Sequence, residues 1–240
     1  MVAASRMKQL QVTIVERSGA ETPTTLTIGE VLLAGYTGRN RASVIEHIRE
    51  LDKLGIAPPP AVPMVYAVDS ELLTTAAAIE VSGPDTSGEV EVCLVPLGKE
   101  LLVGLGSDHT DRKQEAVDIG ESKTLCQKPV SRTFWRYDDV RDHWDTIEIR
   151  SWAFAGATRQ LYQEGTLHEF MCVDDLLDEL KRLGHADLDG RYIFGGTIPT
   201  LGGLVCGGRF EAELRDPVLD RTLTCAYDVR RRPTVGGVNG

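Results

Sequence analysis

Short segments rich in Val, Ile and Leu, separated by glycine, follow one another along most of this chain. This pattern predicts many short strands. Because long helices do not alternate with these segments, a doubly wound parallel sheet is excluded and an α+β, β-rich domain is favoured. The strands are expected at residues 9–16, 79–82, 90–96, 101–105, 192–195, 208–214 and 222–227, with a further extended stretch at residues 24–36.

Two segments are predicted to be helices. Over residues 41–54 the apolar residues, among them Val44 and Ile48, recur at helical spacing. We expect this helix to end at Gly55, because glycine accepts a left-handed cap and the prolines that follow cannot extend a helix. The second helix, over residues 173–183, has acidic residues early and basic residues late, the order that a helix dipole favours.

Composition restricts the class of protein and its partners. The 240 residues, 42% hydrophobic and 26% charged, are typical of a globular chain. The net charge of −10 repels both phosphate backbones and anionic bilayers, so neither a nucleic acid nor a membrane is expected as a partner. No segment resembles a signal peptide, and the five cysteines are widely separated, which favours a cytoplasmic location.

Glu89 and Glu91 alternate with valine and are therefore expected on one face of a strand. Two like charges held side by side suit a hard cation, which relieves their repulsion. An exposed acidic strand face explains the same pattern, and the pattern alone favours that explanation.

Asp108 follows the strand expected at residues 101–105, in a loop dense with polar residues. It could supply a third carboxylate to the same cation, giving the oxygen-rich shell that Mg²⁺ or Mn²⁺ prefers. An aspartate turn, with Arg112 as its surface partner, is an equally good interpretation.

His47 and Glu50 are three residues apart on the predicted helix and therefore share a face. A carboxylate that orients an imidazole produces a competent general base near neutral pH. Taken alone, the pair is better explained as ordinary residues of a solvated helix surface.

The order of several short motifs resembles the fumarylacetoacetate hydrolase superfamily, and the resemblance extends over residues 31–229. Within that superfamily the chain is most similar to an uncharacterised bacterial group known only as a domain of unknown function. The motifs are His-Ile-Arg-Glu at 47–50, Glu-Val-Glu at 89–91, Ser-Asp-His-Thr-Asp-Arg at 107–112, Ser-Lys at 122–123 and Gly-Thr-Ile-Pro at 196–199.

The resemblance implies a metal centre and a catalytic dyad. Glu89, Glu91 and Asp108 would ligate a divalent cation, Mg²⁺ or Mn²⁺. His47 and Glu50 would form a dyad on a mobile lid that activates water.

The resemblance also assigns roles to three further residues. Lys123 would lie beside the metal and the substrate oxygens, Arg112 would hold the acidic loop or the substrate, and Thr197 would contact the substrate carboxylate. This chain departs from the usual family loop, Asn-Asp-Val-Ser-Ala-Arg-Asp, by carrying His109 beside the metal and Lys113 in place of an acid. These departures affect the choice of substrate.

The fold and function implied are a mixed β-sandwich roll and a hydrolase that cleaves a C–C bond in a small diketo or oxo acid through a metal-stabilised enolate. A lyase, decarboxylase, dehydratase or isomerase of the same enolate chemistry stays open, as does a member of the fold that binds a small carboxylic acid without turnover. We expect a homodimer. The catalytic domain is expected at residues 31–232, with a small strand segment at 1–30 packed on it and a flexible tail at 233–240.

A thiol mechanism is the competing interpretation. Cys126 lies three residues after Lys123, which could lower the pKa of the thiol. We favour a buried, inert cysteine, because no cysteine-hydrolase signature surrounds it.

Overall fold

The computed structural model describes residues 7–53 and 58–232, without the side chains of residues 47 and 50–53. No helix in this part of the chain is long and apolar enough to cross a membrane. The expected cap at Gly55 and the tail at 233–240 lie outside the described residues.

The larger of two main sheets has eight strands in the order β2-β1-β12-β9-β8-β15-β3-β4. The strands pair in both parallel and antiparallel senses, so the sheet is mixed. They are β1 (Lys8–Val15), β2 (Glu21–Ile28), β3 (Glu30–Gly35), β4 (Met64–Asp69), β8 (Val90–Leu97), β9 (Glu100–Ser107), β12 (Thr133–Arg136) and β15 (Arg191–Phe194).

The second sheet has five strands in the order β14-β13-β16-β17-β6. They are β6 (Ala78–Val81), β13 (Glu148–Ala155), β14 (Thr158–Thr166), β16 (Arg209–Asp216) and β17 (Arg221–Arg231). Two short pairs join β10 (Thr110–Asp111) to β7 (Thr86–Ser87) and β11 (Lys128–Pro129) to β5 (Leu73–Thr74).

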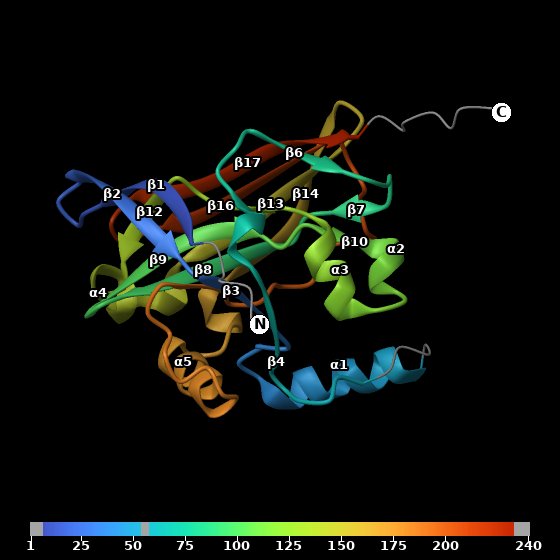
Figure 1. Ribbon diagram of the computed structural model, residues 1–240, viewed down its shortest axis with the longest axis horizontal. Helices are drawn as coiled ribbons and strands as arrows, with labels where there is room; N and C mark the ends of the chain where they lie inside the picture. The colour runs from blue at the N-terminus through green and yellow to red at the C-terminus, as the bar shows by residue number, and fades with distance from the viewer. Residues whose placement is uncertain (1–6, 54–57, 233–240) are drawn as a thin grey trace.

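The helices lie on the outside of the two sheets (Figure 1). In Figure 1, α1 and α5 lie below the sheets, and α2 and α3 lie near one end of them. The helices are α1 (Arg41–Lys53), α2 (Arg112–Glu115), α3 (Ile119–Leu125), α4 (Tyr137–Val140) and α5 (Val173–Arg182), with short 3₁₀ turns at Ser70–Leu72, Arg141–Thr146 and Leu167–Glu169.

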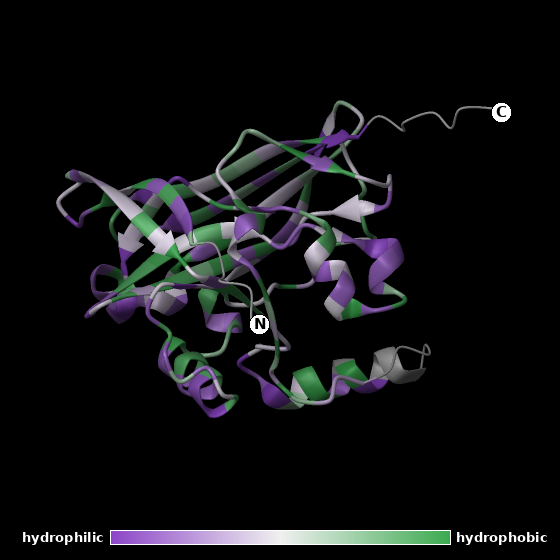
Figure 2. Ribbon diagram, in the orientation of Figure 1, coloured by the Kyte–Doolittle hydropathy of each residue, from purple (hydrophilic) through white to green (hydrophobic). Residues whose placement is uncertain are grey.

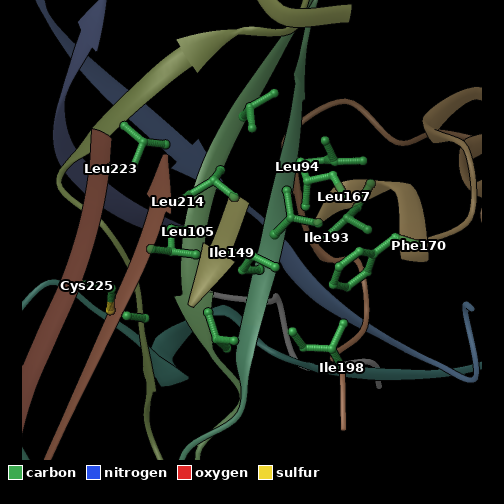
Figure 3. Packing of buried hydrophobic residues seen from close by; sticks show 14 of the residues in the cluster. Leu94, Leu105, Ile149, Leu167, Phe170, Ile193, Ile198, Leu214, Leu223 and Cys225 are labelled. Carbon is green, nitrogen blue, oxygen red and sulfur yellow. The ribbon is translucent and has the colours of Figure 1, made fainter. Parts of the chain in front are cut away.

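The main hydrophobic core fills the space between the two sheets. Leu94, Leu105 and Ile193 of the larger sheet meet Ile149 and Leu214 of the smaller one (Figure 3). The strands of both sheets carry apolar and polar residues, and α5 likewise combines the two as an amphipathic helix does (Figure 2). The burial of apolar surface between the sheets fixes their relative position.

Strand β8 is buried on both faces. Val92 and Leu94 point into the core between the sheets, whereas Cys93 and Val95 point into a second cluster on the opposite face, with Phe134. A strand enclosed in this way consists of a nearly continuous apolar run, and a charged side chain on it is buried unless it lies at an end.

The predicted α+β, β-rich class is confirmed, and the predicted helices correspond to α1 and α5. The single extended stretch predicted at residues 24–36 is wrong, because it is two strands, β2 and β3, separated at Gly29. Strands β13 and β14 were not predicted, since buried polar residues, Ser151 and Gln163, interrupt their apolar alternation. The domain boundaries stay a prediction.

Replacement of Gly104, on the central strand β9, tests how closely the second cluster is packed. A Cβ there would lie 2.5 Å from the ring of Phe134, so we expect Gly104→Ala to lower the free energy of unfolding by about 1–3 kcal/mol. Gly202→Ala is the matched control, because no atom lies within 4 Å of its Cβ position. Urea unfolding of both variants measures the difference, and equal stabilities would contradict this account of the packing.

Candidate functional site

The register of the β8–β9 hairpin brings three carboxylates together. Glu91 pairs with Gly106, and the same register places Asp108 opposite Glu89, whose carbonyl oxygen accepts a hydrogen bond from the Asp108 amide at 3.0 Å. Residues paired directly across an antiparallel ladder share a face. One carboxylate oxygen from each of Glu89, Glu91 and Asp108 therefore lies within 4.8 Å of the others.

Two of these carboxylates are buried. Glu91 is 4% exposed and Asp108 is 2% exposed, so the interpretation of this strand as an exposed acidic face is wrong. Burial, together with the charges of Asp108 and Glu89, raises the pKa of Glu91 well above its usual range. The fold therefore holds a carboxylate where ionisation is costly unless a cation is near.

Two lysines hold Asp108. Lys123 Nζ lies 2.7 Å from Asp108 Oδ2, and Lys128 Nζ lies 2.7 Å from Oδ1. Burial alone would raise the pKa of Asp108, but the two ammonium groups outweigh it and hold this pKa well below its usual range. Asp108 is therefore ionised at neutral pH.

Arg112, the first residue of α2, pairs with the third carboxylate and with Glu115 of the same helix. Its Nη1 lies 3.2 Å from Glu89 Oε1 and 2.7 Å from Glu115 Oε2, while its Nε donates to Ser87 Oγ at 2.7 Å. Lys123 Nζ also approaches Glu115, at 3.5 Å. Arg112 thus holds the acidic side chains in place through direct ion pairs.

Two aspartates begin the helices that carry these cations. The Asp111 side chain accepts a hydrogen bond from the Gln114 amide at the start of α2, and the Asp118 side chain accepts from the Glu121 amide at the start of α3. Side-chain caps of this kind stabilise a helix by about 1 kcal/mol each. The caps fix the positions of α2, which carries Arg112, and of α3, which carries Lys123.

A glycine turn after β15 closes the other side of the cluster. The Gly196 amide donates to Glu91 Oε2 at 2.7 Å. Gly196 has a φ of 97°, and a Cβ there would lie 1.9 Å from Thr37 Oγ1, so only glycine fits. Thr197 follows; the residue is exposed, and its hydroxyl donates to the Val90 carbonyl at 2.9 Å.

Gln163 fixes this turn against β8 from the smaller sheet. Its Nε2 donates to Thr197 Oγ1 at 2.8 Å and to the Ile198 carbonyl at 2.6 Å. Its Oε1 accepts from the Val90 amide at 3.0 Å and from Ser151 Oγ at 2.9 Å. A buried amide with both of its ends bonded holds the strand start and the turn rigidly together.

His109 is buried beside the cluster as a neutral group. Burial, with the charges of Lys128 and Arg112 nearby, lowers the pKa of His109 to about 3. Its Nδ1 lies 3.0 Å from the Tyr227 hydroxyl, which in turn lies 2.8 Å from Ser107 Oγ. This residue therefore does not act as a proton acceptor near neutral pH.

A cavity of about 390 Å³ lies between α5 and the first turn of α1, and none of the three carboxylates is among the described residues that line it. Tyr36 lines this cavity, and its backbone φ of 59° is one that residues other than glycine rarely adopt. Burial and the charge of Glu115 raise the pKa of Tyr36, whereas the charge of Lys123 lowers it.

For the predicted dyad, the structure describes only the position of the backbone. His47 and Glu50 lie in α1, but their side chains are not among those that the structure describes.

Cys126, the alternative nucleophile, is buried, and burial raises the pKa of its thiol. A thiol of this kind stays protonated and unreactive.

Sequence reasoning missed Lys128, Glu115, Gln163 and Tyr227. These residues contact partners that lie between 3 and 120 positions away in the sequence. Most of these pairs come together only when the sheets form. Glu115 had one usable signal, its spacing of three residues from Arg112. The other three carry no local pattern.

The residues present fit a divalent cation by the chemistry of their donor set. Three carboxylates, two of them buried, offer oxygens within 4.8 Å of one another, which is the ligand type that Mg²⁺ and Mn²⁺ prefer. The cluster has an excess of one negative charge when all of its carboxylates are counted as ionised. The carboxylates are those of Glu89, Glu91, Asp108 and Glu115, and three cationic side chains lie near them. Those cations are Arg112, Lys123 and Lys128.

Comparisons with known proteins identify the fold. Residues 34–227 match the family described as "Protein of unknown function (DUF2848)". No curated protein matches at a significant level.

Several solved structures are similar. A protein assigned to the fumarylacetoacetate hydrolase family from Yersinia pestis CO92 is 14% identical over 92% of this chain and 100% of that chain, with a TM-score of 0.63. The 2-hydroxyhepta-2,4-diene-1,7-dioate isomerase from Mycobacterium marinum is 16% identical over 90% of this chain and 83% of that chain, with a TM-score of 0.60. A 2-keto-3-deoxyarabinonate dehydratase is 16% identical over 86% of this chain and 75% of that chain, with a TM-score of 0.61. The predicted fumarylacetoacetate-hydrolase-like fold is confirmed.

The raised pKa of Glu91 predicts how its removal changes stability. The stabilising contribution of a group with a raised pKa is present below its unfolded value, about 4.5, and is lost as pH rises through the folded value. Glu91→Gln keeps an acceptor for Gly196 and removes the charge. Without divalent cations at pH 8, we expect it to raise the free energy of unfolding by about 1 kcal/mol or more, with no gain near pH 4.

Urea unfolding at both pH values, in the presence of a chelator, measures this effect. Glu80→Gln, at an exposed carboxylate of β6, is the matched control and should change neither value appreciably. A Glu91→Gln variant less stable than the natural protein at pH 8 would contradict the electrostatic description of the cluster.

Proposed function

The chain belongs to the family described as protein of unknown function DUF2848, and we propose that it is a divalent-metal-dependent enzyme acting on a small oxo acid. The favoured reaction is hydrolytic cleavage of a C–C bond in a diketo or oxo acid. The observation that carries the proposal is the buried carboxylate cluster of Glu89, Glu91 and Asp108, next to the Gly196 turn.

Glu89, Glu91 and Asp108 would hold Mg²⁺ or Mn²⁺. When bound, such a cation polarises a carbonyl oxygen and stabilises the enolate that leaves when the C–C bond breaks. The neighbouring charges favour an acidic substrate, because a divalent cation converts the excess of one negative charge in the cluster into an excess of one positive charge.

The residues of the chain divide the remaining tasks. Lys123 Nζ, 3.8 Å from Glu89 Oε2 and 2.7 Å from Asp108 Oδ2, is placed to pair with a substrate oxygen at the cluster. The charges of Asp108, Glu89 and Glu115 raise the pKa of Lys123 despite its burial, so it acts as a cation and not as a base. Thr197, exposed at the glycine turn, would contact a substrate carboxylate by turning its hydroxyl proton from the Val90 carbonyl toward it.

Hydrolysis needs a base that takes a proton from water, and we assign it to His47, oriented by Glu50. His109 is unsuitable, because its pKa of about 3 leaves the imidazole too weak an acceptor. The assignment to α1 comes from the family resemblance of the His-Ile-Arg-Glu motif at residues 47–50.

The alternative is a reaction of the same enolate without attack by water. Two similar structures support it, one of an isomerase and one of a dehydratase. A reaction in ¹⁸O-labelled water distinguishes hydrolysis from isomerisation, because only hydrolysis incorporates the labelled oxygen into a new carboxylate of the product. A further alternative is non-catalytic, namely a protein that binds a small carboxylic acid without turning it over. The expected homodimer stays a prediction.

Cation binding tests the proposal without requiring the substrate. We expect Mn²⁺ or Mg²⁺ to raise the unfolding temperature of metal-stripped protein, and oxalate, which mimics a pyruvate enolate, to raise it further. A ligand at about a hundred times its dissociation constant stabilises the folded state by roughly 2.7 kcal/mol. Glu91→Ala should abolish both increments, whereas Glu80→Ala should keep them. A folded protein that responds to no divalent cation would refute the metal-dependent function.

The dyad predicts a separation of binding from turnover. With a substrate found among 2,4-dioxo acids, we expect His47→Ala to lower kcat by about 10²–10⁴-fold while the affinity for Mn²⁺ stays within a few fold. Cys126→Ser is the comparison and should keep full turnover, because the thiol is buried. Steady-state kinetics and a Mn²⁺ titration measure the two quantities. Full activity in His47→Ala, or its loss in Cys126→Ser, would overturn the assignment of the base.

A further inference from the structure

Lys128 is a fully buried cation in the cluster, with an exposed fraction of 0%. Its Nζ lies 2.7 Å from Asp108 Oδ1 and donates to the His109 carbonyl at 2.8 Å. Its backbone belongs to β11, which pairs in register with Leu73 of β5. The ammonium group is therefore held at a fixed place, with the carboxylate oxygen of Asp108 as its main partner.

The other two carboxylates of the cluster are held in a similar way. One oxygen of Glu91, Oε2, accepts the Gly196 amide at 2.7 Å. One oxygen of Glu89, Oε1, lies 3.2 Å from Arg112 Nη1. Glu91 and Glu89 thus each have one oxygen bound closely by a donor of the protein, whereas Asp108 has both, Oδ1 by Lys128 and Oδ2 by Lys123.

The orientation of Asp108 follows from Lys123. Lys123 Nζ lies 2.7 Å from Asp108 Oδ2 and 3.8 Å from Glu89 Oε2, so Oδ2 is the oxygen that faces the neighbouring carboxylate. Oδ1, on the other side, is bound by Lys128. For both oxygens to reach one cation, the carboxylate would have to rotate away from a buried ammonium group and leave that charge unpaired, which is costly.

We infer that Lys128 determines which cation the site accepts, by restricting Asp108 to ligation through a single oxygen. Ca²⁺ takes six to eight oxygens and frequently binds carboxylates through both, whereas Mg²⁺ demands a compact shell of six. Lys128 therefore disfavours Ca²⁺ relative to Mg²⁺ and Mn²⁺. This inference rests on the proposed function, since it concerns the same metal site.

Two effects of Lys128 can be separated by experiment. As a positive charge it weakens the binding of every divalent cation to a similar extent, because Coulomb repulsion does not distinguish ions of equal charge. As a positioning residue it acts on the number of oxygens available, to which the two kinds of cation respond differently. The ratio of the Ca²⁺ and Mg²⁺ dissociation constants isolates the positioning effect.

The test compares Lys128→Met with the natural protein at one pH. Methionine keeps much of the side-chain volume and removes the donor. Lys181→Met, at an exposed lysine of α5 outside the cluster, is the matched control. Each protein is stripped of metal, and the dissociation constants of Mg²⁺ and Ca²⁺ are measured by competition against Mn²⁺, followed by electron paramagnetic resonance.

We expect the natural protein and Lys181→Met to bind Mg²⁺ more tightly than Ca²⁺. In Lys128→Met the ratio should move toward Ca²⁺ by about tenfold or more, the lower range of effects for residues that orient metal ligands. A Lys128→Met variant that binds both cations more tightly with an unchanged ratio would overturn the inference and leave Lys128 as a charge only. If the natural protein binds none of the three cations, the proposed function itself is refuted.

A second measurement uses only the natural protein, in case Lys128→Met does not fold. Crystals of the natural protein are soaked separately with Mn²⁺ and with Ca²⁺. The inference predicts that Asp108 contacts either cation through Oδ2 alone and keeps its contact of about 2.7 Å with Lys128. Ligation of either cation through both Asp108 oxygens would overturn it.

Discussion

The direct opposition of two carboxylates, Glu89 and Asp108, across a buried pair of strands is the constraint on which the rest of the site depends. Like charges placed opposite each other on a ladder repel, and burial removes the water that would screen them. The ladder fixes both backbones, so the side chains cannot separate far. The surrounding structure has to supply positive charge at this point, and it does so through Arg112 and the two lysines.

Elements from distant parts of the chain meet at the cluster for this reason. The short helices α2 and α3, each begun by an aspartate cap, bring cations to one side. The Gly196 turn brings a backbone amide to the other side, and Gln163 holds that turn from the second sheet. The cations and the Gly196 amide limit the freedom of the carboxylates directly, and the caps and Gln163 hold those groups in place. The arrangement is therefore rigid around its polar centre, which is the property that a preorganised metal site requires.

The sequence could predict the elements of this site better than their environment. The alternation around Glu91 and the apolar run after it located strand β8, and the helical periodicity located α1. The fold class followed from the density of short strands. Burial could not be predicted, because alternating Glu and Val suit an exposed face equally well, and only tertiary contacts, such as those of Lys123 and the Gly196 turn, distinguish the two cases. Lys128 and Gln163 were invisible for the same reason, since their partners are set by tertiary contacts.

The central claim is that the three carboxylates form one open metal site that accepts an acidic ligand. Electron paramagnetic resonance of Mn²⁺ bound to the protein, recorded with ¹⁷O-labelled oxalate, tests it most directly. The account predicts one tightly bound Mn²⁺ per chain, whose resonance lines broaden with labelled oxalate, and no such binding in Asp108→Asn. Tight binding of Mn²⁺ that persists in Asp108→Asn, or lines that labelled oxalate leaves unchanged, would contradict it.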